Sequence, residues 1–130
     1  MAQRSRIPNL TKEKNIVKTS RGIMMVEPSK TSTTPLIDEL TRKMTAAWRH
    51  RRDSEDGYRG FHVCVCGVFS DNRDHWVSNS NGDGLLTNSL CVHYLAFHRD
   101  DIPQEELDKV RALTYGEEEP NEKELAKPKR

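Results

Sequence analysis

The stretch "GFHVCVCGVFSDNRDHWV", residues 60–77, carries the pattern on which the fold prediction depends. In its first part the large apolar residues recur at every second position, which is the period of a β-strand, so successive side chains point to opposite faces. Cys64 and Cys66 therefore share one face of the predicted strand with His62. Gly67 follows the second cysteine and permits the tight backbone turn that a metal-binding loop requires. The pattern predicts that the two thiols converge on one point.

A third cysteine lies in "TNSLCVHYLAFHR", residues 87–99. Zinc in structural sites takes four ligands in a tetrahedron, usually two from each of two elements, and thiolate sulfur selects zinc over magnesium or calcium. We therefore expect a structural zinc site made by Cys64, Cys66, Cys91 and one histidine. The sequence leaves open which histidine completes the site: His93, His98 or His62. The alternative is that the three cysteines are ordinary buried small residues and the histidines lie at surface or capping positions.

The composition of the chain also favours a stabilising element beyond the hydrophobic core. Hydrophobic residues make up 34% of the sequence and charged residues 32%. The part expected to fold, about residues 34–115, is short and has few large apolar side chains, so apolar burial alone gives marginal stability. A bound ion would add its binding free energy to folding. Association into a homo-oligomer would have the same effect, so this observation does not choose between the two.

Periodicity and end signals predict three helices. Thr34 can cap a helix, and Pro35 sits where its missing N–H costs nothing, so a helix is expected to begin there. Its apolar stripe runs to Trp48, and the basic run "RHRR" (49–52) ends it, where positive charge meets the negative end of the helix dipole. The other two helices are expected from about Asn88 to His98 and from Pro103 to Gly116.

Two short strands are predicted after the cysteine pair. "HWV" (75–77) and "LLT" (85–87) are separated by Asn-Gly and Asp-Gly, which are typical of hairpin turns. The expected fold class is α+β, a small antiparallel β-hairpin with about three helices and disordered N- and C-terminal tails. The expected divisions are a flexible basic N-terminal arm (1–33), a single compact domain (34–116) and a disordered tail with acidic and basic residues (117–130).

Charge is distributed unevenly, although the net charge is only +1. Residues 1–59 carry 13 Lys/Arg against 7 Asp/Glu (+6), residues 60–100 carry 2 against 4 (−2), and residues 101–130 carry 6 against 9 (−3). A basic front and an acidic rear suit a flexible arm that touches a polyanion, and the alternative is two solvated tails. Within the basic arm, the short apolar run "GIMMV" (22–26) could add an edge strand.

Several classes of protein are disfavoured by the sequence. No apolar run reaches about 18 residues, so no membrane span is expected, and the first residues lack the hydrophobic stretch of a secretory signal. A cytoplasmic location is therefore expected, and three cysteines, an odd number with two only one residue apart, do not form a disulfide framework. The motifs of zinc deaminases and of phosphate-cradling loops are absent.

Three short motifs between residues 62 and 99 carry a resemblance to a known family. "RDHWV" offers Asp74 and His75, "LLTNSLC" offers Asn88, and "LAFHR" offers His98. Together they resemble the HNH family of metal-dependent nucleases, which is built on a ββα-metal motif. That family often has two cysteine pairs that hold a structural zinc, and Cys64-x-Cys66 and Cys91-x-His93 lie near the corresponding places.

The resemblance implies hydrolysis of phosphodiesters with a second divalent cation as cofactor. His75 would then be the general base that activates water, while Asp74 and His98 would hold the divalent ion. Asn88 would fix the loop that carries the base. Arginines such as Arg73 and Arg99 would face phosphate.

Other residues are candidates for binding a partner. The helix end with Arg49, Arg51 and Arg52 could meet nucleic acid or an acidic protein, or be a solvated helix face. A nucleotide or protein could contact Arg59, Trp76 and Arg99, with a place in the core as the alternative for the tryptophan. The sequence thus predicts a small zinc-stabilised, non-enzymatic binding module for a protein, nucleotide or nucleic-acid partner. An HNH-like nuclease is the alternative.

Overall fold

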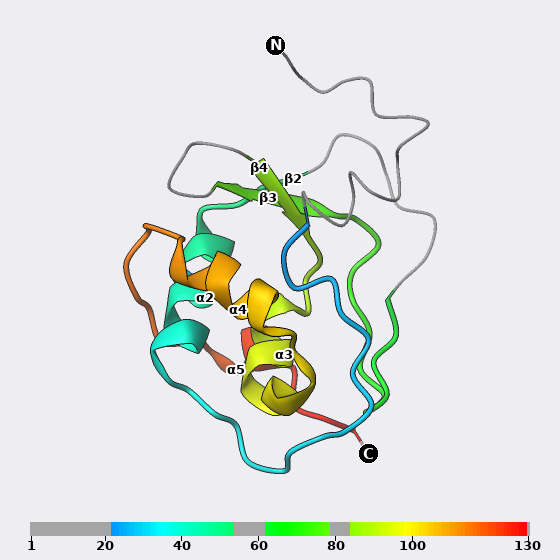
Figure 1. The fold of residues 1–130 in the computed structure, drawn as a ribbon. Coiled ribbons are helices and arrows are strands. Elements are labelled where there is room, and N and C mark those ends of the chain that lie inside the picture. The colour runs from blue at the N-terminus through cyan, green and yellow to red at the C-terminus, as the bar shows by residue number, and fades with distance from the viewer. Residues whose placement is uncertain (1–21, 54–61, 79–83, 130) are drawn as a thin grey trace.

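A three-stranded antiparallel sheet lies on one side of a group of helices (Figure 1). The computed structural model describes residues 22–53, 62–78 and 84–129. The strands are β2 (Arg52–Asp53), β3 (His75–Ser78) and β4 (Gly84–Thr87), in the order β2-β3-β4. The hairpin predicted from "HWV" and "LLT" is confirmed, because His75 pairs with Thr87 and Ser78 with Gly84. Its turn, with the Asn-Gly and Asp-Gly pairs, lies largely outside the described residues.

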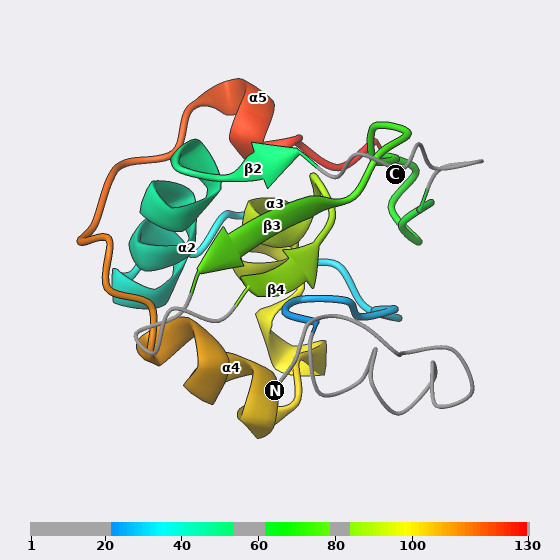
Figure 2. The same cartoon turned by 90° about the horizontal axis from the view of Figure 1, so that it is seen from above.

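The helices of the described part lie beneath the sheet. They are α2 (Glu39–Arg49), α3 (Cys91–Phe97), the 3₁₀ helix η1 (Arg99–Asp101), α4 (Gln104–Arg111) and α5 (Glu122–Leu125). Seen from above, α3 lies behind β3 and β4, while α2 and α4 lie to the sides of the sheet (Figure 2). The predicted α+β class is therefore confirmed. None of these helices is long and apolar enough to cross a lipid bilayer.

Helix α2 begins later than the sequence predicts. Thr34 and Pro35 do not start it; the cap is Asp38, whose Oδ1 accepts a hydrogen bond of 3.2 Å from the backbone N–H of Thr41. The guanidinium of Arg99 holds the same carboxylate with two hydrogen bonds of 2.6 and 2.8 Å. Asp38 is a residue type preferred at N-caps, so two local start signals compete here, and the contact with the distant Arg99 reinforces the one at Asp38. The helix ends at Arg49, within the predicted basic run.

The core forms around α3, whose seven residues are all buried. Ile23 and Met24 belong to this core although they lie in the predicted flexible arm. The backbone N–H of Ile23 donates to the carbonyl of Leu86 at 2.9 Å, next to a parallel bridge between Gly22 and Leu86. Part of "GIMMV" thus adds to the edge of β4, in agreement with the predicted edge strand. The large side chains of the core include Ile23, Met24, Leu40, Met44, Leu90, Val92, Tyr94, Leu95, Val110 and Leu113.

The segment after α4 packs against the helices, which differs from the expectation of a disordered tail. Arg42 of α2 pairs with Glu117 at 2.9 Å, and its carbonyl accepts a hydrogen bond of 3.1 Å from the N–H of Glu118. Helix α5 then contacts α3. The acidic run looks like a solvated tail in the sequence because the arginines that pair with it lie about 75 residues earlier in the chain.

Candidate metal centre

The cysteine pair lies in a tight hairpin that we call the knuckle (residues 62–70). Val63 and Phe69 form an antiparallel bridge, and the N–H of Cys64 donates to the carbonyl of Val68 at 2.8 Å. Gly67 has φ of 97°, the left-handed region that glycine adopts without strain, and its N–H donates to the carbonyl of Cys64 at 2.9 Å. The predicted strand is thus a turn here. The predicted alternation still holds, since both cysteines are buried and Val63 is 71% exposed.

Helix α3 and the residue that follows it supply the two histidines of the centre. His93 lies within the helix, and His98 is the residue directly after its last turn. Five positions on a continuous helix would separate their directions by about 140°. His98 leaves the helical conformation, with φ of −134° and ψ of 30°, and its ring meets that of His93 at a centroid distance of 4.9 Å. The end of the helix therefore brings the two imidazoles together.

Four ligand atoms meet at one buried point. The Sγ of Cys64 lies 3.1 Å from the Nε2 of His98, and the Sγ of Cys66 lies 3.3 Å from the Nε2 of His93. The two Nε2 atoms are 3.1 Å apart, and all four atoms lie within 4.8 Å of one another. Zn–S and Zn–N bonds at tetrahedral angles would separate the ligand atoms by roughly 3.3–3.8 Å. The group is therefore compatible in size and chemistry with a zinc ion.

The hydrogen bonds on the far side of each ring fix which nitrogen can bind a metal. The Nδ1 of His93 lies 2.9 Å from the carbonyl of Leu125, and the Nδ1 of His98 lies 2.5 Å from the carbonyl of Lys30. A carbonyl oxygen only accepts, so both Nδ1 atoms carry the proton. In a neutral ring this leaves each Nε2 with its lone pair directed at the centre. Metal-binding histidines in proteins are oriented in this way.

Burial disfavours the charged forms of His93 and Cys64. It lowers the pKa of His93 to about 4 and raises the pKa of the Cys64 thiol to about 11. At neutral pH His93 is therefore a neutral imidazole. Its Nε2 then carries a lone pair and lies 3.1 Å from the Nε2 of His98. A bound metal ion would accept this lone pair.

Cys91, which the sequence predicts as a ligand, lies outside the group of Cys64, Cys66, His93 and His98. Its side chain is completely buried in the hydrophobic core, and burial raises its pKa to about 12. Two helical positions turn the chain by about 200°, so Cys91 and His93 point to nearly opposite sides of α3. The second imidazole takes the place of the expected third thiolate. His62, also considered as a ligand, pairs with Asp74, with 3.9 Å between Nε2 and Oδ1.

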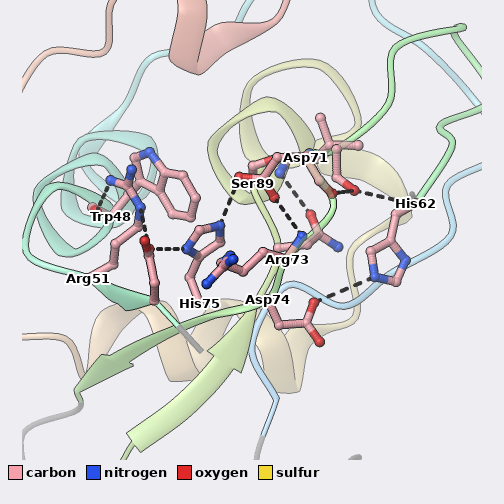
Figure 3. A network of polar contacts seen from close by, with 12 residues as sticks. Trp48, Arg51, His62, Asp71, Arg73, Asp74, His75 and Ser89 are labelled. Atoms are coloured by element: carbon pink, nitrogen blue, oxygen red, sulfur yellow. Dashed lines mark hydrogen bonds and ion pairs between the residues drawn. The ribbon is translucent and has the colours of Figure 1, made fainter. Parts of the chain in front are cut away.

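A third buried histidine lies outside the group of Cys64, Cys66, His93 and His98 (Figure 3). His75 is held between two carboxylates, with 2.7 Å from Nδ1 to Asp53 and 2.9 Å from Nε2 to Asp71. Its ring stands edge-on to Trp48 at a centroid distance of 4.8 Å. The backbone N–H of Asp71 in turn donates to the hydroxyl oxygen of Ser89 at 2.8 Å. The network joins the sheet to α2 and to the loop after the knuckle.

The residues singled out by the HNH resemblance fall into separate sets of contacts. His98 belongs to the candidate metal site, His75 lies between its two aspartates, and Asp74 contacts His62. Asn88 is buried, and its Oδ1 accepts the N–H of Leu90 at 2.8 Å, ahead of α3. The nuclease interpretation stays a prediction.

The predicted binding residues have varied surroundings. Arg99 is engaged with Asp38, and Arg49 with the acidic residues of the C-terminal segment. Arg51 lies over the ring of Trp48, 4.0 Å from its centroid. Arg52 and Trp76 are partners across β2 and β3. Arg59 lies outside the described residues.

Comparison of the chain with protein-family models, with curated proteins and with solved structures finds no match. Within the described residues, the group formed by Cys64, Cys66, His93 and His98 has the arrangement of a metal site. It has two thiols and two imidazoles, which are ligands that zinc prefers.

Proposed function

We propose that the protein binds one structural zinc ion and serves as a non-enzymatic binding module. The supporting observation is the convergence of Cys64, Cys66, His93 and His98, with their ligand atoms within 4.8 Å of one another in the interior. The zinc would join the knuckle to the end of α3. Its binding free energy would then stabilise a fold with a small hydrophobic core.

The number and burial of the ligands favour a structural role over a catalytic one. Catalytic zinc sites keep one coordination position for water or substrate, whereas structural sites use four protein ligands. Here four side chains are available, and none is more than 3% exposed. A zinc ion held by all four would have neither an open position nor contact with solvent.

The knuckle is the surface that we propose for a protein partner. Val63, Val65 and Phe69 are exposed by 71%, 46% and 53%, which is unusual for large apolar residues gathered in one short loop. A zinc ion beneath the loop would hold these side chains rigid, so little conformational entropy would be lost on binding. Residues 62–78 carry one arginine against two aspartates, and Lys129 lies over the ring of Phe69, 5.4 Å from its centroid, so these residues together have no excess of positive charge, which favours a protein over nucleic acid.

The test is removal of the metal from reduced, freshly purified protein. A strong zinc chelator is expected to lower the melting temperature by at least about 10 °C, because zinc binding contributes several kcal/mol to folding. Added zinc should restore the original transition, and a chelator selective for calcium should have no effect. Unchanged melting after complete chelation would contradict the proposal.

A further inference from the structure

Two segments near the ends of the described chain contact the histidines of the centre through backbone carbonyls. The carbonyl of Leu125 accepts the Nδ1 proton of His93, and that of Lys30 accepts the Nδ1 proton of His98. The two carbonyls come from opposite sides of the sequence. In Figure 1 the red C-terminal segment and the early cyan segment both pass close to α3. Each of the two histidines is thus oriented by a different segment of the chain, and we call these segments the C-terminal and the N-terminal strap.

The C-terminal strap (residues 117–129) is anchored by Arg49. Its guanidinium makes two hydrogen bonds to Glu124, of 2.9 and 2.7 Å. It also contacts Glu118 at 2.7 Å and the carbonyl of Glu119 at 2.7 Å. Glu124 is the residue directly before Leu125, and its side chain is only 10% exposed. Further along, the N–H of Lys129 donates to the carbonyl of Cys66 at 2.9 Å, so the strap contacts both halves of the centre.

The N-terminal strap (residues 28–32) is anchored by Asp101. Its Oδ2 accepts the backbone N–H groups of Ser29 and Lys30, each at 2.8 Å. Lys30, whose N–H donates to Asp101, is also the residue whose carbonyl accepts the hydrogen bond from His98. Asp101 lies in η1, directly after the ligand histidine, so the strap, the anchor and the ligand form one local unit.

We infer that Arg49 and Asp101 are positioning residues of the zinc site, each acting through a strap carbonyl on one ligand histidine. The inference rests on the proposed zinc binding. Arg49 holds the Leu125 carbonyl against His93, and Asp101 holds the Lys30 carbonyl against His98. Loss of a partner of a metal-bound histidine costs about 10- to 100-fold in metal affinity. An anchor that acts through such a partner is expected to change affinity by about tenfold.

The test compares Arg49→Gln and Asp101→Asn with two control variants in the full chain. The controls are Arg111→Gln and Asp108→Asn, which remove an exposed ion pair of 3.2 Å within α4. Zinc release to excess chelator is measured for each zinc-loaded protein, and long-range ¹H–¹⁵N spectra follow the ring protons. Both test variants should release zinc about tenfold faster than wild type, and both controls at the wild-type rate.

The two variants should differ in which ring they affect. In Arg49→Gln the Nδ1 proton of His93 should exchange faster with solvent while that of His98 is unchanged, and in Asp101→Asn the reverse should hold. Release rates equal to the controls, or the same change at both rings, would overturn the inference. Wild-type protein that binds no zinc would instead overturn the proposed function itself.

A wild-type measurement and a milder variant keep the test independent of folding defects. In zinc-loaded wild type both ligand rings should carry the proton on Nδ1, and metal on Nδ1 of either ring would overturn the inference. Arg49→Lys keeps one positive charge for the two glutamates. It should speed zinc release about threefold, as a smaller loss of the same interaction, and an unchanged rate would count against the anchor.

Discussion

Replacing Cys66 should weaken metal binding, whereas replacing Cys91 should leave it unchanged. Both side chains are buried, at 1% and 0% exposure, and both substitutions to alanine remove one sulfur atom. For Cys91→Ala the loss is packing, about 1 kcal/mol, or roughly 3–6 °C in melting temperature. For Cys66→Ala one of four ligands is lost. A quarter of a zinc-binding free energy of about 10–16 kcal/mol corresponds to roughly 100- to 1,000-fold in affinity.

The assay is zinc stoichiometry and affinity by competition with a chelator, together with thermal unfolding of each variant. Cys91→Ala should keep one zinc per chain with wild-type affinity. Cys66→Ala should bind zinc far more weakly and unfold at a much lower temperature. Equal loss of zinc from both variants would indicate that Cys91 is a ligand and would refute the proposed ligand set.

Three further predictions concern the surroundings of the site. Asp38→Asn should lower the unfolding free energy by about 1–2 kcal/mol at pH 7 in urea denaturation, because the helix cap loses its charged bond to Arg99; an unchanged midpoint would contradict this. His75→Phe should cost about 1–3 kcal/mol through its two lost hydrogen bonds but retain zinc, and loss of zinc would be the unexpected result. Burial raises the pKa of the Cys64 thiol to about 11, so zinc must displace its proton when it binds. In competition titrations the apparent zinc affinity should therefore fall at least about tenfold per pH unit as the pH drops from 8 to 6. An affinity independent of pH would argue against thiolate ligation.

The sequence pattern predicts the helices and strands whose formation depends on neighbouring residues. The β3–β4 hairpin follows from its turn residues and strand propensity, and the buried stripe of α2 follows from helical periodicity. For the start of α2 two local signals compete, Thr34-Pro35 and Asp38, and the contact of Asp38 with Arg99 about 60 residues later favours the second. Packing of the C-terminal segment could not be predicted from local pattern, since its acidic residues pair with arginines far away in sequence.

The candidate site was predictable on one side only. The period of two placed both cysteines of the knuckle on one face, and Gly67 indicated the turn. On the other side, the choice among Cys91, His93 and His98 depended on the helical direction of each residue and on where α3 ends. The geometry of α3 argues against Cys91 once His93 is accepted. The position of His98 could not be foreseen, because it requires the helix to stop directly before it.

Native mass spectrometry of reduced, freshly purified protein tests the central claim most directly. We predict a single species heavier than the bare chain by about 63 Da, the mass of one zinc ion less the two protons that its thiolate ligands release. Acid or a chelator should return the mass to that of the bare chain. A folded protein found only at the bare mass, even after incubation with zinc, would contradict the account.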